Sequence, residues 1–282
     1  MRKKIFNRFN FDIWAKWCLS SFAVISGAAI FLPNCPEGKE YIKYIVGGVL
    51  CFLLIGSYFV IAVHQIRSKH VKLTINNTEV NIFFGDIFKL EGKKVIAFNE
   101  YFDTLVDDKI IAHKSLDGQV IDKKYIDKDL FDQCVLENNE LITNGSNPKR
   151  KNGKTIKYKL GQIQPFNDYY ALAFTKFDSD NKANLTSIEY STCLLEMWRQ
   201  LNKLYAQNIV NIPLLGSGIT RILDSCNITN QELLEIMLET LNISKMSFKE
   251  PSKINIVLYP GEKDNCDINK YDLIRIKSIF RR

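Results

Sequence analysis

The residues best suited to bind a ligand lie in the loop Pro213–Ile219. They read Pro-Leu-Leu-Gly-Ser-Gly-Ile and follow an apolar run, 208–212, of the kind that forms a buried strand. Glycine lets backbone N–H groups approach an anion closely, because it has no Cβ and adopts positive φ without strain. The pattern predicts a phosphate or diphosphate site at the end of a strand. A tight strand exit that binds nothing fits the same residues, since Gly-x-Gly often follows a strand.

No set of residues with catalytic or metal-ligating spacing accompanies this loop in the sequence. The seven cysteines include no CxxC pair, and two of the three histidines, His64 and His70, follow an apolar run near the N-terminus. Scattered cysteines are typical of a reduced, cytosolic domain. Asp103, Asp107 and Asp108 are candidate general bases, but we interpret them as exposed acids of a loop. We therefore predict no catalytic residue, no metal and no cofactor.

Charge is distributed unevenly along the 282 residues, whose net charge is +7. Basic residues gather before and after the apolar N-terminal runs and again between 149 and 159. The second cluster falls in an Asn- and Gly-containing stretch, so we interpret it as a solvated loop or hairpin within an insertion at about 138–167. No aromatic ladder or DNA-reading motif accompanies it, and we predict no nucleic-acid partner.

Two long uncharged runs near the N-terminus predict a transmembrane hairpin within residues 1–68. The spans cover about 14–32 and 42–63, each near the roughly 20 residues that cross a bilayer. The turn between them, 33–40, contains two prolines and is too short to form a domain. Basic residues flank both outer ends, which places the N- and C-termini in the cytoplasm. A cleaved signal peptide is the alternative, but a second full-length span argues against it.

Strands and helices alternate in the rest of the chain. Short β-rich runs at 71–75 and 80–84 are separated by Asn76-Asn77, and further strands are expected at 94–98, 169–177, 208–215 and 253–259. Two Thr-x-x-Glu capping boxes, which begin at Thr186 and Thr229, each open a helix with an apolar face. This order predicts an α/β fold with a partly parallel sheet, which binds ligands at the carboxyl ends of its strands.

Three motifs occur in an order that resembles macro domains, which are α/β modules that bind ADP-ribose and related metabolites. Gly85-Asp86-Ile87 follows the first strand pair, the run 95–99 is similar to the next buried strand, and 212–219 is similar to the phosphate loop. The resemblance implies a macro-domain-like three-layer α/β/α sandwich with a mixed sheet over residues 71–282.

The resemblance also implies roles for individual residues. Asp86 accepts a hydrogen bond from the adenine amino group, Asn99 lies near the distal ribose, and Tyr259 packs near adenine. Backbone N–H groups of the phosphate loop hold the diphosphate. The complete predicted binding set is Asp86, Ile87, Asn99, Leu215, Gly216, Ser217, Gly218, Ile219, Thr220 and Tyr259. Macro domains that hydrolyse ADP-ribosyl bonds have a glycine-rich loop after the asparagine, whereas 99–104 here reads Asn-Glu-Tyr-Phe-Asp-Thr.

A two-span hairpin before a macro-like domain resembles the membrane effectors of Thoeris antiphage defence systems. The resemblance implies that the macro-like domain binds an ADP-ribose derivative, made from NAD by a TIR-domain enzyme. It further implies that the activated protein forms a homo-oligomer and disrupts membrane lipid in the bacterial inner membrane, which kills the infected cell. A membrane-anchored ADP-ribosyl hydrolase or NAD-processing enzyme is the alternative function. An anchor whose α/β domain binds a protein partner is the third.

Overall fold

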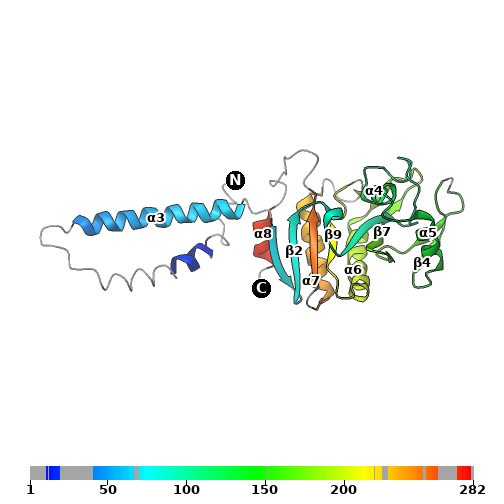
Figure 1. Cartoon of the computed structure of the whole chain (residues 1–282). Coiled ribbons are helices and arrows are strands. Elements are labelled where there is room, and N and C mark those ends of the chain that lie inside the picture. The colour runs from blue at the N-terminus through cyan, green and yellow to red at the C-terminus, as the bar shows by residue number, and fades with distance from the viewer. Residues whose placement is uncertain are drawn as a thin grey trace. The chain divides into compact units, whose positions relative to one another are not determined.

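The computed structural model describes residues 11, 13–19, 41–66, 70–150, 152–218, 220–223, 228–249, 252–259 and 272–280. The chain divides into two compact units. One comprises Met1–Lys69 together with Asp272–Ile279, and the other comprises His70–Tyr271 together with Phe280–Arg282. The second unit contains the sheet (Figure 1).

The smaller unit contains α3 (Tyr41–Ile66), a helical stretch at 13–19 and α8 (Leu273–Ile279). Trp14 joins the helical stretch to α3, because its indole Nε1 donates to Leu54 O and Ser57 Oγ, both at 3.1 Å. The Trp14 ring also meets the Tyr58 ring edge-on, with centroids 5.8 Å apart. The C-terminal helix α8 contacts α3, so both ends of the chain contribute to this unit.

The predicted transmembrane hairpin is not supported. Part of its first span and the turn after it, residues 20–40, lie outside the described residues. Crossing a bilayer requires about 20 consecutive apolar residues in one helix. Among the described residues, no helix combines that length with that apolar character. The prediction of a multi-pass protein of the bacterial inner membrane, with both termini in the cytoplasm, is therefore wrong.

A mixed nine-stranded sheet forms the centre of the larger unit, as the described residues define it. Its order is β1-β2-β11-β9-β3-β7-β8-β10, and β6 pairs with β7 off this path. The run from β2 to β7 is parallel, whereas β1, β6 and β8 each pair antiparallel. The strands are β1 (His70–Ile75), β2 (Thr78–Phe84), β3 (Lys93–Asn99), β6 (Ile163–Phe166), β7 (Tyr169–Phe177), β8 (Ala183–Leu185), β9 (Val210–Pro213), β10 (Arg221–Ile222) and β11 (Lys253–Leu258).

The hairpin between β1 and β2 forms where the sequence predicts it. Asn76 and Asn77 have φ of 49° and 62°, the left-handed values that a two-residue type I′ turn needs and asparagine tolerates. The Asn76 amide also donates to Leu241 O at 3.0 Å, which ties the turn to the helix α7 (Asn230–Ser244). Strand β9 is shorter than predicted and ends at Pro213, so Leu214 and Leu215 belong to the loop.

Both predicted capping boxes are present, at the starts of α6 (Ser187–Leu204) and α7. In each, the Thr side chain accepts from the backbone N–H of the Glu, and the Glu side chain accepts from the N–H of the Thr. The two helices contact each other, and the buried Trp198 Nε1 donates to Thr240 Oγ1 at 3.0 Å across their contact.

Helices cover both faces of the sheet. The helices α4 (Leu116–Asp122) and α5 (Lys128–Glu137) pack on Ile96, Phe98, Ala171 and Ala173. The opposite face of β7 packs on α6, where the rings of Phe174 and Tyr190 meet edge-on with centroids 5.9 Å apart. Figure 1 shows α4 and α6 on opposite sides of β7. The result is the α/β architecture with a mixed sheet that the sequence predicts.

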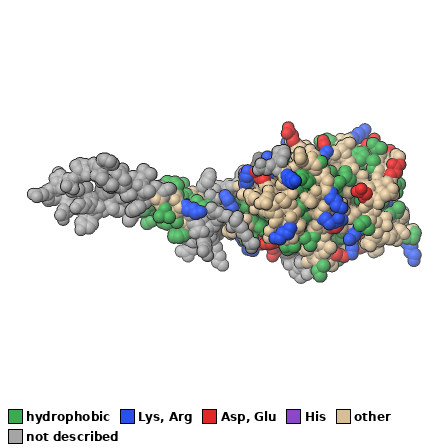
Figure 2. All heavy atoms as spheres, turned by 90° about the horizontal axis from the view of Figure 1, so that it is seen from below, with side chains coloured by type: hydrophobic (Ala, Val, Ile, Leu, Met, Phe, Trp, Pro, Cys, Tyr) green, Lys and Arg blue, Asp and Glu red, His purple; other side chains and the backbone are tan. Residues whose placement is uncertain are grey.

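The segment 138–167 divides into two parts. Its first part contains β4 (Thr143–Ser146) and β5 (Ile156–Tyr158), which form a separate two-stranded antiparallel sheet. Its last part is β6, which belongs to the main sheet. Figure 2 shows the Lys and Arg side chains on one face of the larger unit in several separate groups, with hydrophobic and uncharged surface between them.

Candidate ligand-binding site

A cavity of about 1230 Å³ lies at the carboxyl ends of the central strands. Because β2, β11, β9, β3 and β7 are parallel, these ends meet along one edge of the sheet. The residues that follow β2, β9 and β11 line the cavity together with the last residues of β3. Further walls come from the segment 108–123, which includes α4, and from the turn between β7 and β8. A cavity of this size accommodates a nucleotide-sized ligand.

Nine of the ten residues predicted to bind ligand line this cavity. They are Asp86, Ile87, Asn99, Leu215, Gly216, Ser217, Gly218, Thr220 and Tyr259. The tenth, Ile219, lies outside the described residues. The fold thus brings together segments that are far apart in the sequence. Which of these residues contact a ligand stays a prediction.

The loop after β9 is held from inside the protein. Gly216 has φ of +83°, and a Cβ there would lie 3.3 Å from Leu233 Cδ2 and 3.4 Å from Tyr190 Cε2. The buried Tyr190 hydroxyl donates to Leu215 O at 3.0 Å, and burial raises the pKa of this phenol, which keeps it a neutral donor. The backbone conformation at 216 therefore favours glycine, and a Cβ there would also need Leu233 or Tyr190 to move by a few tenths of an ångström.

The two other residues of the Gly-Ser-Gly turn behave differently. A Cβ at Gly218 would meet no atom of the described residues within 4 Å, so packing against them does not require glycine there. Ser217 turns back on the loop, because its hydroxyl and its N–H both donate to Leu214 O, at 2.7 and 3.4 Å. The predicted row of outward N–H groups is consequently not complete in this conformation.

Asp86 begins a short 3₁₀ helix, η1 (Ile87–Lys89), at the end of β2. One carboxylate oxygen, Oδ1, accepts from Phe88 N at 3.0 Å, while Oδ2 is 4.0 Å from Lys89 Nζ. The adjacent Gly85 N donates to Leu258 O at 3.0 Å, which continues the β2–β11 pairing to the rim of the cavity. Tyr259 follows β11 directly and is 68% exposed. The first oxygen of Asp86 therefore positions the chain, and Asp86 as a residue lines the cavity.

Asn99 ends β3 and is only 2% exposed. Its Oδ1 accepts from Tyr101 N at 2.9 Å and from Asp103 N at 3.4 Å. Because a backbone N–H can only donate, the atom that faces it must be the oxygen, and the amide orientation follows from chemistry. Its Nδ2 is buried and has no partner among the described residues. A buried donor without a partner costs about 1–3 kcal/mol, which a ligand acceptor would recover.

The wall at 108–123 carries titratable groups that sequence reasoning did not assign to the site. Burial raises the pKa of Asp117, near the start of α4, to about 6. The hydrogen bond that His113 Nδ1 donates to Asp122 Oδ2, at 2.6 Å, raises the pKa of His113. Ser115 caps α4 through its side chain, so an N-cap signal in the sequence could have located this helix.

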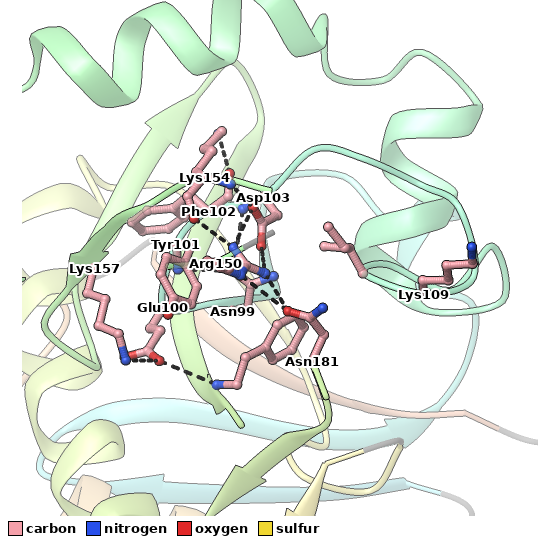
Figure 3. Close-up of polar contacts among 12 residues, drawn as sticks. Asn99, Glu100, Tyr101, Phe102, Asp103, Lys109, Arg150, Lys154, Lys157 and Asn181 are labelled. Carbon is pink, nitrogen blue, oxygen red and sulfur yellow. Dashed lines mark hydrogen bonds and ion pairs between the residues drawn. The ribbon is translucent and has the colours of Figure 1, made fainter. Parts of the chain in front are cut away.

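The interpretation of Asp103 as an exposed loop acid is wrong. The basic cluster lies in and beside the antiparallel pair β4–β5, as the predicted hairpin would, but its Arg150 is buried rather than solvated. The Asp103 side chain is 1% exposed and lies 2.7 Å from Arg150 NH2, with Arg150 itself 5% exposed. Two lysines of the cluster also pair with acids. Lys154 lies 2.6 Å from Asp132 and Lys157 lies 3.0 Å from Glu100. Figure 3 shows the Asp103–Arg150 and Glu100–Lys157 pairs around the loop that follows β3. The insertion is therefore bound to the site rather than free of it.

Comparison with known proteins agrees with this geometry. The family model for the macro domain of Thoeris protein ThsA matches residues 80–259, which run from β2 to Tyr259. Thoeris protein ThsA of Bacillus amyloliquefaciens (strain Y2) is 44% identical over 234 residues, which cover 80% of this chain and 78% of that protein. This chain belongs to the ThsA macro-domain family. The ThsA match contains every described residue of the predicted binding set.

Solved structures give a weaker likeness. Two variants of the Oceanobacillus iheyensis macrodomain are 16% and 15% identical to the chain, with TM-scores of 0.43 and 0.42. They cover 75% and 76% of this chain, and the alignments cover 94% and 100% of theirs. Membership in the ThsA family therefore rests on the sequence matches, and it fits a role in Thoeris antiphage defence.

Proposed function

We propose that this ThsA-family protein is an antiphage defence protein whose macro domain binds an ADP-ribose-type signal nucleotide. The signal derives from NAD and is the product of a TIR-domain enzyme. The observation that supports this proposal best is that Asp86, Asn99 and the Gly216 loop, which lie at the carboxyl ends of three different strands, line one cavity. Family membership supports the defence role.

Each part of such a ligand has a matching group in the cavity. The second carboxylate oxygen of Asp86 accepts from the adenine amino group, and the exposed Tyr259, which follows β11, lines the same cavity. The loop around Gly216 receives the diphosphate, whose charge favours backbone donors at a strand end. The unpartnered Nδ2 of Asn99 donates to an oxygen of the distal ribose. Binding favours an assembled, homo-oligomeric state only if the ligand prefers that state over the inactive one.

The site binds its ligand without chemistry in this proposal. Tyr101, Phe102 and Asp103 occupy the place where a hydrolase would have its glycine-rich loop. All three are at most 1% exposed, and none of them lines the cavity. The space in which glycines would position a water is thus filled by core side chains. Turnover of an ADP-ribosylated substrate by the purified full-length chain would replace this conclusion with a hydrolase.

Titration calorimetry of the full chain with ADP and with ADP-ribose tests the proposal. Both should bind, and Gly216→Val and Asp86→Ala should each weaken binding by about tenfold or more, which corresponds to the loss of at least one good interaction. Gly56→Val is a matched control, because a Cβ at that position of α3 meets no atom within 4 Å. The absence of heat with either nucleotide and the wild-type chain would overturn the proposal.

A further inference from the structure

The guanidinium of Arg150 is fully occupied by neighbouring groups, one of which lines the cavity. It makes five hydrogen bonds, two to Asp103, one to Lys154 O and two to Asn181 Oδ1, with distances from 2.7 to 3.2 Å. Its carbon also lies 3.9 Å from the centroid of the Tyr101 ring. A guanidinium has five N–H donors, so none is left over for a ligand. Arg150 can therefore act on a ligand only through the groups that it holds.

Asn181 is the one of these groups that lines the cavity. It lies in the turn between β7 and β8 with φ of 58°. Its Oδ1 accepts from Arg150 Nε at 3.2 Å and from NH2 at 3.0 Å. Since a guanidinium cannot accept, the oxygen must face Arg150, and Nδ2 must lie on the other side. Figure 3 shows this orientation, with the Asn181 nitrogen turned away from Arg150.

Asn99 and Asn181 present the same pattern to one cavity. In both, protein donors occupy the oxygen, and Nδ2 makes no hydrogen bond to another described residue. Both residues line the cavity. Two amide groups arranged in this way offer donors and no acceptor. They select a ligand group with acceptor oxygens, such as hydroxyl or carbonyl oxygens, and they disfavour a group that only donates.

We propose that Asn181 is a specificity residue for the distal part of the ligand, beyond the diphosphate, and that Arg150 is its positioning residue. This inference rests on the proposed function. The insertion thereby acts on ligand choice, because it carries Arg150 to Asp103 and Asn181. Gly153 makes the approach possible: it has φ of +84°, and a Cβ there would lie 2.7 Å from both Asp103 Oδ1 and Arg150 NH1.

The test compares ADP, which lacks the distal part, with ADP-ribose, which has it, by calorimetry on the full chain. Asn181→Asp keeps an oxygen toward Arg150 but replaces the donor in the cavity by an acceptor. It should weaken ADP-ribose binding by about tenfold or more and leave ADP binding within about twofold. Asn184→Asp is the matched control, since Asn184 donates to Lys182 O and does not line the cavity.

Arg150→Lys tests the positioning role separately. Lysine retains a positive charge beside Asp103 but cannot hold Asn181 with two parallel donors. The same selective loss of ADP-ribose binding is expected. Should Asn181→Asp not fold, Asn181→Gly removes the amide at a φ that glycine adopts freely, and it carries the same expectation.

The outcomes separate the two proposals. If the two variants lose affinity for ADP-ribose and keep their affinity for ADP, the inference is supported. Unchanged ADP-ribose binding by Asn181→Asp and Arg150→Lys overturns it, and so does an equal loss for both nucleotides, which would mark a purely structural role. If the wild-type chain binds neither nucleotide, the proposed function fails first, and this inference fails with it.

Discussion

Replacing Asp103 by alanine should destabilise the larger unit strongly. The carboxylate is 1% exposed and accepts three hydrogen bonds, from Arg150 NH1 and NH2 and from Lys154 N. Its removal leaves the guanidinium of Arg150, which is 5% exposed, without its closest counter-charge. Breaking a buried ion pair from one side costs about 3–5 kcal/mol. Stabilities of natural proteins are only about 5–15 kcal/mol, so this is a large fraction of the total.

Urea unfolding measures this cost. Trp198 is fully buried between α6 and α7 and serves as the fluorescent probe once the two other tryptophans, Trp14 and Trp17, are replaced by Phe. The midpoint should fall by the equivalent of about 3–5 kcal/mol. A melting curve of the same variant should shift by about 6–20 °C, from about 2–4 °C per kcal/mol for a domain of this size.

A matched substitution shows what would refute this reasoning. Asp168→Ala also removes an ion-paired carboxylate, but this side chain is 70% exposed and pairs with Lys93 at 3.0 Å. It should cost about 0–1 kcal/mol, because water solvates the remaining charge. The double variant Asp103→Leu with Arg150→Met should lose less unfolding free energy than Asp103→Ala alone, because neither charge of the pair stays buried. If Asp103→Ala lowers the free energy of unfolding no more than Asp168→Ala does, the Asp103–Arg150 pair does not hold the insertion to the site.

Three further predictions concern stability. Burial raises the pKa of Asp117 from 3.8 to about 6, so the protonated carboxyl stabilises the fold fully below about pH 4, and this stabilisation is lost as the pH rises through 6. In urea unfolding at pH 8, Asp117→Asn should raise the free energy of unfolding by on the order of 1–3 kcal/mol over wild type, and at pH 4 it should not change it. Thr240→Val should cost about 1–3 kcal/mol in the same assay without changing nucleotide affinity, because it leaves the Trp198 N–H buried without a partner. Asn255→Leu should lower the free energy of unfolding by about 2–4 kcal/mol, since it removes the hydrogen bonds that join Asn255 to Asn81 and Asn211 on the two neighbouring strands. A decrease below about 0.5 kcal/mol would mean that water reaches these three asparagines.

Much of the fold follows from interactions between residues close together in the sequence. The capping boxes at Thr186 and Thr229 involve groups three residues apart, so their side chains meet in whatever tertiary context the helix has. The Asn76-Asn77 turn and strand β7 are likewise local patterns, and the structure has both. The positive φ at Gly216 belongs to the same class. Nine residues of the predicted binding set line one cavity, because parallel strands present their carboxyl ends at one edge; that they bind a ligand stays a prediction.

Tertiary structure alone decided the electrostatics of the site. Asp103 and Arg150 are separated by 47 residues, and no local signal indicates that they meet. Isolated charges in loops are usually solvated, so sequence reasoning placed both in water, whereas packing of the insertion on Tyr101 buries them. The orientation of Asn181 depends on that same pair. Local sequence sets what each segment forms, and long-range packing sets which charges lose their water.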